Sequence, residues 1–352
     1  MPKGADAAAG NLNPPDTGRP DADSFGRADA RLEAHNLALK NPEDLREATR
    51  GADLRIIQLA TGGFEGLLTH AQVGGFSLSA GDFGPDIRAR GVMNAELVTI
   101  GTMLDSSGEV SQWDYDVRPG DIIVFPKSVE QEGRYTGRSR YVTITLSEQE
   151  LAAHVKTEGR LQESEFWTRI RRFQPSEAQR ASMREYLARR VLQLREGKVP
   201  LSAAGIDFFR RSVLEAFVGC IAGEVQDDRE EQYFRGARLV RDVEDYVDAL
   251  RPGRPVHISE LCSVLLVSRR KLHRAFQDTI GVGPMAYLRL RRLSAAHNAL
   301  RSGRMAGGSV TQTALEYGFC DLGRFASYYR RIFDEAPSET IRSAQLRGVR
   351  PA

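Results

Sequence analysis

Basic side chains crowd one short stretch near the carboxyl end, the run SRRKLHRAF that starts at Ser268. Leu272, Phe276 and Ile280 recur at every fourth position, which predicts a short helix with one buried face and Ser268 as its N-cap. Six side chains that can donate hydrogen bonds then point away from that face: Arg269, Arg270, Lys271, His273, Arg274 and Gln277. Such donors suit the base edges and phosphates of a DNA major groove. The stretch therefore predicts recognition of a nucleic acid, not catalysis.

A second stretch repeats this arrangement about 53 residues later. Aligning Phe276 with Tyr329 also aligns Pro284 with Pro337. The second copy has an apolar stripe of Phe325, Tyr329 and Phe333, and it leaves four side chains outside: Arg324, Ser327, Arg330 and Arg331. The duplication predicts two tandem helix-turn-helix units.

A shorter predicted helix precedes each basic helix. In the first unit Ser259 is the expected N-cap, and the apolar stripe consists of Ile258, Leu261, Cys262, Leu265 and Leu266. In the second unit Ser309 and Gln312 form a capping box, and Gly318 can supply the turn. The helix that joins the two units has three expected core positions: Tyr287, Leu288 and Leu293.

A basic run taken alone is usually just a solvated helix face. Two such faces in a repeated scaffold are what favours DNA binding. Arg274 has a competing partner, because Asp278 lies four residues further along the same helix.

At these positions the chain resembles the DNA-binding domain of AraC/XylS transcription regulators. The first half of the resemblance consists of Ser268, Leu272, Arg274, Phe276, Gly281, Pro284, Tyr287, Leu288, Arg292, Leu293 and Ala296. The second half consists of Gly318, Phe319, Phe325, Arg330, Arg331 and Pro337. Together they cover about 100 of the 352 residues.

The resemblance implies that both basic helices enter successive major grooves of double-stranded DNA. Its base-reading positions fall on Arg269, Arg270, His273, Arg274, Leu322, Gly323, Arg324 and Ser327. Two positions depart from the family pattern, since a Ser is common in place of Gly323 and an Arg in place of Ser327. The second helix is thus expected to read fewer base edges than the first. The resemblance also implies a homodimer and activation through RNA polymerase.

The net charge of +2 hides an uneven distribution. From Pro255 to Ala352 there are 15 Lys and Arg against 7 Asp and Glu, a net charge of +8, whereas the rest carries 34 against 40, or −6. A basic end beside a mildly acidic remainder is typical of a DNA-binding module.

Length and composition predict a multidomain protein with both α and β structure, because 352 residues with 41% hydrophobic content can form two or three cores. We expect a disordered tail over residues 1–45, a cupin-like β sensor domain over 46–147, a helical linker or dimerisation region over 148–235, and the DNA-binding domain over 236–352. A short helix can begin at Pro42 with Asn41 as its cap.

The segment from Asp53 to Leu146 alternates apolar and polar residues between turn residues, which predicts about eight short strands in a barrel or sandwich. The stretch from Gly120 to Pro126 resembles the second half of the cupin motif, G-D-x-x-x-x-P. In regulators of this family such a domain often binds the signal or dimerises. His70 is the only histidine in the segment, so no metal site and no cofactor are expected.

A pocket for a small organic effector is the function that this β domain suggests. Aromatic side chains at strand spacing are more often core than pocket, but they are the candidates for its lining: Trp113, Tyr115, Phe125, Tyr135 and Tyr141.

Two amphipathic helices follow, the first after a capping box formed by Ser176 and Gln179. Their apolar stripes consist of Met183, Leu187, Val191 and Leu194, then Ile206, Phe209, Val213, Phe217 and Ile221. Either the sheet or a second subunit could cover them. A further helix over residues 235–250 opens the DNA-binding domain, and the run RPGRP from Arg251 to Pro255 predicts a hinge.

Three classes of function remain. The first is a sequence-specific transcription regulator whose β domain senses an effector. The second is an enzyme, of the cupin type or a DNA-repair methyl acceptor, that carries a DNA-binding module. The third is a constitutive DNA-binding protein that senses nothing. The missing histidine ligands argue against the cupin enzyme, and Cys220, Cys262 and Cys320 lack zinc-type spacing. With no long apolar run and no leader sequence, we expect a cytoplasmic protein without a membrane partner.

Overall fold

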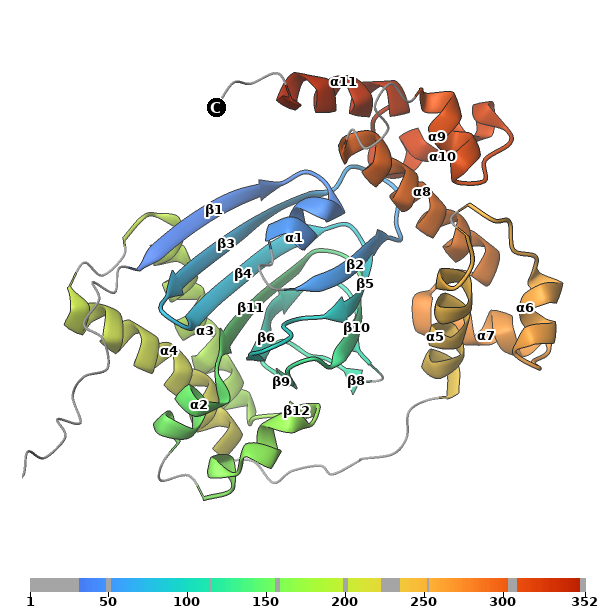
Figure 1. The fold of residues 1–352 in the computed structure, drawn as a ribbon. Coiled ribbons are helices and arrows are strands. Elements are labelled where there is room, and N and C mark those ends of the chain that lie inside the picture. The colour runs from blue at the N-terminus through green and yellow to red at the C-terminus, as the bar shows by residue number, and fades with distance from the viewer. Residues whose placement is uncertain are drawn as a thin grey trace, which may run out of the picture.

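The structure, a computed structural model, describes residues 32–48, 52–113, 115–155, 159–198, 202–222, 235–251, 253–302 and 309–348. A β-rich N-terminal part is followed by a helical C-terminal part, which confirms the predicted fold class (Figure 1). In the described ranges, no helix has the length and apolar character needed to cross a membrane.

The β strands form two antiparallel sheets. The larger sheet has the order β1-β3-β4-β11-β6-β9-β12 and the smaller has the order β2-β5-β10-β7-β8. The larger sheet comprises β1 (Glu33–Leu39), β3 (Glu65–Val73), β4 (Phe76–Gly84), β6 (Val98–Ser106), β9 (Ile122–Phe125), β11 (Ser139–Leu146) and β12 (Arg171–Phe173). The smaller comprises β2 (Asp53–Gln58), β5 (Ile87–Val92), β7 (Val110–Gln112), β8 (Tyr115–Asp116) and β10 (Glu130–Tyr135). Apolar residues of both sheets share a core, so the two sheets form a sandwich.

The first described segment differs from the expected tail. Strand β1 pairs with β3 over its whole length, and α1 (Pro42–Ala48) follows it. Leu39 and Leu45 are buried in the sandwich core, which gives this polar-looking segment enough apolar contact to order it. The tail therefore cannot extend to residue 45. Residues 1–31 of that prediction lie outside the described ranges, whereas the helix does begin at Pro42 as predicted.

Helices cover the outer face of the larger sheet. They are α2 (Glu148–His154), α3 (Glu177–Arg195) and α4 (Ala203–Ala222), with two 3-10 turns, η1 (Gly159–Gln162) and η2 (Ser164–Thr168), between them. The predicted capping box of Ser176 and Gln179 begins α3. Leu187 and Phe217, one from each predicted stripe, are buried in one core with the sheet residues Phe76 and Leu78. The chain itself thus supplies the partner surface for both stripes.

In its described residues, the C-terminal part packs seven helices around a second core, which Ile57 of β2 also joins. They are α5 (Arg235–Asp248), α6 (Ile258–Val264), α7 (Arg269–Ile280), α8 (Pro284–Ser302), α9 (Val310–Glu316), α10 (Leu322–Phe333) and α11 (Pro337–Gly348). Val243 of α5 lies in this core with Phe276 and Tyr329 of the two repeats. The long helix α8 joins the two helix-turn-helix units, and its expected core residues Tyr287, Leu288 and Leu293 are buried (Figure 1).

Candidate nucleic-acid interface and sandwich cavity

Helix α7 presents the first set of predicted DNA contacts. Ser268 caps it by accepting a hydrogen bond from the Lys271 backbone N–H at 3.2 Å, and Gly281 ends it in the left-handed conformation. Leu272 and Phe276 are fully buried, which fixes the rotation of the helix. The opposite face is exposed and carries Arg269, Arg270, Lys271, His273 and Arg274.

One of these cations has an intramolecular partner. The Arg274 guanidinium lies 3.5 Å from the Asp278 carboxylate, the competing pair that the sequence suggests. Within the described residues, no carboxylate lies within 4.0 Å of the charged groups of Arg269, Arg270 or Lys271. These three cations are therefore available to an external anion.

Helix α10 presents the second set. Asp321 caps it by accepting from the Arg324 backbone N–H at 2.9 Å, and its carboxylate also lies 3.3 Å from the Arg324 guanidinium. Phe325, Tyr329 and Phe333 are buried as predicted. The exposed face carries Leu322, Gly323, Arg324, Ser327, Arg330 and Arg331. This helix offers fewer donors in its first turns than α7, consistent with the departures at Gly323 and Ser327.

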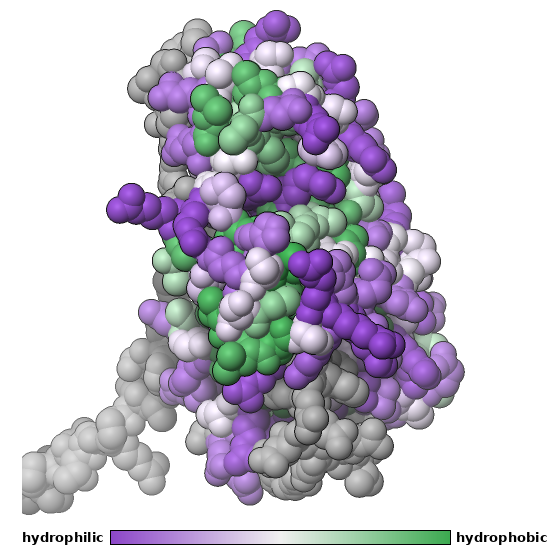
Figure 2. Space-filling model, turned by 90° about the vertical axis from the view of Figure 1, so that its right-hand side faces the viewer, coloured by the Kyte–Doolittle hydropathy of each residue, from purple (hydrophilic) through white to green (hydrophobic). Residues whose placement is uncertain are grey.

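Helices α7 and α10 both lie among the C-terminal helices, on the right-hand side of Figure 1. Figure 2 looks onto the side of Figure 1 where the C-terminal helices lie, and hydrophilic side chains project from it between smaller apolar patches.

Leu266 is 91% exposed, so its predicted place in the apolar stripe is wrong. Helix α6 ends at Val264, which puts Leu266 in the turn that follows. The cap of α6 is also His257, not the predicted Ser259.

Arg292 ties helix α8 to the second unit. Its guanidinium donates to the Gly318 carbonyl at 3.0 Å and lies 4.9 Å from the centre of the Phe319 ring. Gly318 has φ +77°, and a Cβ there would lie 2.3 Å from the Gly253 carbonyl oxygen. Gly253 thus packs backbone to backbone against the second unit. The segment predicted as a hinge is therefore packed against the second unit at Gly253. Only glycines at positions 253 and 318 allow the two backbones to come this close.

A buried ionic cluster joins the sandwich to the helical part. Arg88 of β5 makes two hydrogen bonds of 3.0 Å to the Glu244 carboxylate of α5 and one of 3.1 Å to Glu132 of β10. Tyr287 of α8 donates its hydroxyl to Glu244. Arg88, Glu132, Glu244 and Tyr287 are all at most 3% exposed.

Further ion pairs surround this core of the cluster. Arg90 contacts Glu244 at 3.1 Å and Asp245 at 2.7 Å, and Arg241 contacts Glu132 at 2.7 Å. Burial opposes ionisation of Glu244, but the neighbouring Arg88 guanidinium outweighs it and lowers the pKa of that carboxyl to about 2. Arg90 also pairs with Glu130 at 3.0 Å, so each guanidinium group of the cluster faces at least one carboxylate.

The sandwich also touches the ends of both exposed helices. The buried Gln58 side chain, at the end of β2, donates to the Ile332 carbonyl of α10 at 2.8 Å, and the Gly62 N–H donates to the Arg331 carbonyl at 3.1 Å. At the end of α7, a Cβ on Gly281 would lie 2.4 Å from the Arg134 guanidinium of β10. One domain therefore contacts both helix-turn-helix units.

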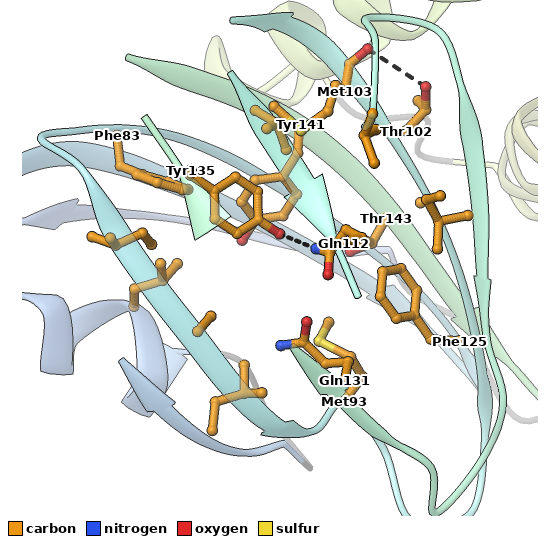
Figure 3. A pocket seen from close by; sticks show the side chains of 18 of the residues that line it. Phe83, Met93, Thr102, Met103, Gln112, Phe125, Gln131, Tyr135, Tyr141 and Thr143 are labelled. Atoms are coloured by element: carbon orange, nitrogen blue, oxygen red, sulfur yellow. Dashed lines mark hydrogen bonds between the residues drawn. The ribbon is translucent and has the colours of Figure 1, made fainter. Parts of the chain in front are cut away.

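A cavity of about 70 Å³ lies between the two sheets. Leu54, Ile56, Ile87 and Val110 come from the smaller sheet, and Met103 and Ile123 from the larger. Figure 3 shows its polar side chains around the same space, with Gln112 hydrogen-bonded to the Tyr135 hydroxyl. The lining residues in the described ranges include no histidine and no charged side chain.

Three of the five predicted aromatic lining residues, Phe125, Tyr135 and Tyr141, line this cavity. Trp113 lies behind Phe125, with its ring centre 5.4 Å from that of Phe125, and its indole N–H donates to the Glu130 carbonyl. Tyr115 instead lies under the Arg172 guanidinium at 4.9 Å. Trp113 and Tyr115 therefore do not belong to the lining.

Two glutamines, Gln112 and Gln131, line the cavity and were not expected there. Both are buried, with Gln112 4% exposed and Gln131 3% exposed. The alternation of β7 and β10 could have placed them on the inner face, but an amide gives no sequence signal that separates a pocket from a solvated strand.

Comparison with known proteins matches the C-terminal part. Residues 261–343 fit the family model described as a helix-turn-helix domain. The XylDLEGF operon transcriptional activator 2 of Pseudomonas putida is 36% identical over 104 residues, which cover 30% of this chain and 63% of that protein. The probable thc operon regulatory protein of Rhodococcus erythropolis is 33% identical over 109 residues, covering 31% and 32%. The match thus spans less than two thirds of either curated relative.

A solved structure also matches part of the chain. A probable AraC family transcriptional regulator from Rhodopseudomonas palustris is 42% identical in sequence, and the match covers 30% of this chain and 97% of that one, with a TM-score of 0.28.

Proposed function

Because this chain belongs to the AraC/XylS family of transcription regulators, we propose that it binds specific DNA sites with α7 and α10 in successive major grooves. The curated relatives are named as transcriptional activators and regulatory proteins, which favours the regulator over the enzyme. We further propose an effector-responsive activator that acts as a homodimer and contacts RNA polymerase. Its effector is a small organic molecule bound in the cavity of the sandwich.

The observation that carries the DNA-binding proposal is the exposed basic face of α7. Arg269, Arg270 and Lys271 stand in the first turn of a capped helix whose other face is locked into a core. Guanidinium groups in such a position match the paired acceptors of guanine and the phosphate oxygens. The fewer donors of α10 support a division of labour, with base readout mainly by α7 and more phosphate contact by Arg330 and Arg331.

Strand alternation supports communication between the cavity and the DNA-binding domain. On β5, Ile87 and Ala89 line the cavity while Arg88 between them faces Glu244. On β10, Gln131 lines the cavity while Glu132 faces Arg88 and Arg241. The same two strands therefore form the cavity wall and the interface with α5. A ligand that shifts either strand would change that interface, which is the linkage an effector requires.

Selection of bound sequences from a random DNA library by the full chain tests the proposal. We expect enrichment of a site with two elements separated by about one turn of the double helix. Substitution of Arg270 should relax the element read by α7 and leave the other element intact. Enrichment of no sequence at physiological salt would refute the reading of α7 and α10 as recognition helices.

A further inference from the structure

The cavity holds two buried hydrogen-bond acceptors that the protein leaves without a partner. The side-chain oxygens of Gln112 and Gln131 are buried, and neither accepts a hydrogen bond within the described residues. Figure 3 shows both oxygens directed into the space between the two amides. A buried acceptor without a donor is costly and therefore rare in folded proteins. The pair indicates a polar group of a ligand between them.

The position of Gln112 is enforced by the backbone below it. Gln112 of β7 pairs with Gly133 of β10, and a Cβ on Gly133 would lie 2.7 Å from the Gln112 amide. The glycine leaves room for the amide to lie flat against β10. The Gln112 nitrogen donates to the Tyr135 hydroxyl, which holds the amide oxygen toward the cavity. Gln131 reaches the cavity from the same strand as Gly133.

The remaining lining decides the charge of the ligand. Leu54, Ile56, Ile87 and Val110 are apolar, and the polar ones besides the glutamines are the hydroxyl residues Thr102, Thr143, Tyr135 and Tyr141. Within the described part of the lining, no side chain could neutralise a carboxylate or an ammonium group. Arg88 and Glu132 lie on the same strands but face α5 and are already paired. Burying an unpaired charge here would be strongly unfavourable.

We propose that the effector is an uncharged, compact alcohol or primary amide whose O–H or N–H lies between the Gln112 and Gln131 oxygens. This inference rests on the proposed sensing role and narrows it to a ligand class. A volume of about 70 Å³ corresponds to on the order of five water molecules. The ligand is therefore a short branched chain or a small ring, with its apolar part against Ile87 and Val110.

A shape-matched series tests the charge and the donor separately. Isobutanol and isobutyramide are neutral and can donate a hydrogen bond. Isobutyrate is an anion and isobutylammonium is a cation. Methyl isopropyl ether is a neutral molecule of similar size that cannot donate a hydrogen bond. Each is titrated up to about 10 mM into the full chain, so that millimolar dissociation constants are detectable. Binding is followed by the shift in melting temperature and by calorimetry.

We expect at least one of the two neutral donors to bind at least tenfold more tightly than isobutyrate, isobutylammonium and the ether. Gln131→Leu and Gln112→Leu should each weaken that binding at least tenfold. Gln131→Leu removes a buried oxygen that has no partner and should not lower the melting temperature of the ligand-free protein, whereas Gln112→Leu also removes the hydrogen bond to the Tyr135 hydroxyl and should lower it. Equal or tighter binding of a charged member overturns the proposal, and so does failure of every member to bind or unchanged binding by both leucine variants.

A parallel measurement of DNA affinity separates this inference from the proposed function. If a neutral donor binds but leaves the affinity for the selected DNA site unchanged, the ligand class stands and the sensing role fails. If a charged member binds and changes DNA affinity, the sensing role stands and the ligand class fails. Arg189→Ala, on the exposed face of α3, controls for the effect of a substitution outside the cavity and should leave ligand binding unchanged. Among the described residues, Arg189 pairs only with Glu185 of the same helix, and it does not line the cavity.

Discussion

Arg88 and Glu244 form a bidentate ion pair that is buried on both sides, with two N–O distances of 3.0 Å between β5 and α5. The two residues are separated by 156 positions in the chain. Their contact joins the sandwich, which contains the cavity, to the helical part, which contains the two exposed basic helices. Water is excluded from it, so the stability of the pair depends on both partners being present.

Removing one partner of this pair should be far more damaging than removing both. Arg88→Met removes the bidentate partner of the buried Glu244 carboxylate and leaves it with Arg90, Tyr287 and the nearby charge of Arg291, and we expect a loss of about 3–5 kcal/mol in the free energy of unfolding. The double variant Arg88→Met/Glu244→Leu should lose clearly less. Urea unfolding of both variants and the parent measures this. Glu244→Leu alone completes the cycle, and a loss in the double variant equal to the sum of the two single losses would show that the pair is not coupled.

His297 predicts a dependence of stability on pH. It is fully buried on α8, with ring nitrogens 3.8 Å from the Glu43 carboxylate and 3.3 Å from the Glu335 carboxylate, and its ring stacks on Phe333. Burial lowers the pKa of His297, but the two carboxylates outweigh burial, so its pKa is raised above the ordinary 6.5. Protonated His297 therefore contributes stability that is fully present below pH 6.5 and is lost as the pH rises through the raised pKa.

Urea unfolding of the parent and of His297→Gln between pH 6 and pH 9 measures this effect. We expect the parent to be the more stable protein at the acidic end, with the difference shrinking toward the alkaline end. His35→Gln is the matched control, because His35 is exposed on β1. A difference between parent and His297→Gln that stays constant with pH would show that His297 remains neutral in the folded chain.

Arg270 and His273 should carry sequence preference. Each projects from the exposed face of α7, so we expect Arg270→Ala and His273→Ala each to cost about 1–3 kcal/mol on the selected site and much less on random DNA. Fluorescence anisotropy with both DNA molecules measures the two affinities. Arg189→Ala on α3 again serves as the control for loss of a surface cation. If the specific and nonspecific affinities fall together, these residues contact phosphates and not bases.

Arg330 and Arg331 should instead act through the phosphate backbone. Both are exposed in the last turn of α10, away from the base-reading positions at its start. Replacing either with Ala should weaken binding to all DNA about equally and reduce the slope of log affinity against log salt by about 0.9 for each lost phosphate contact. Titrations at several salt concentrations measure the slope. A slope equal to that of the parent would place the residue outside the interface.

The C-terminal helices could be predicted because their signals are local. The caps at Ser268 and Ser309 and the stripe of Phe325, Tyr329 and Phe333 all lie within a few turns of the residues they organise. Leu266 was misplaced because an apolar turn residue extends the pattern beyond the true end of α6.

Strands β5 and β10 could not be predicted from their own residues. Their sequences, IRARGV and EQEGRY, contain the charged groups of Arg88 and Glu132 and look like solvated loops. These groups are nevertheless buried, because α5 supplies their partners from more than a hundred residues away. The expectation of about eight strands between Asp53 and Leu146 therefore fell short of the ten described there.

The candidate cavity was partly predictable for a similar reason. Aromatic residue type indicated Phe125, Tyr135 and Tyr141, but the two glutamines that give the cavity its polarity belong to strands on which neighbouring positions alternate between wall and interface. Which face is which depends on how the two sheets and α5 assemble, and single-strand alternation does not contain that information.

Gln58 and Arg134 lie on different strands of the smaller sheet. Gln58 contacts the C-terminal end of α10, and Arg134 contacts the C-terminal end of α7. The sheet thus lies against both α7 and α10 and sets the distance between them. A rigid sheet keeps that distance constant, so we expect the protein to tolerate little variation in the number of base pairs separating the two DNA elements. A twist of the sheet would alter the permitted separation, even if the contacts of each helix with its own bases stayed the same.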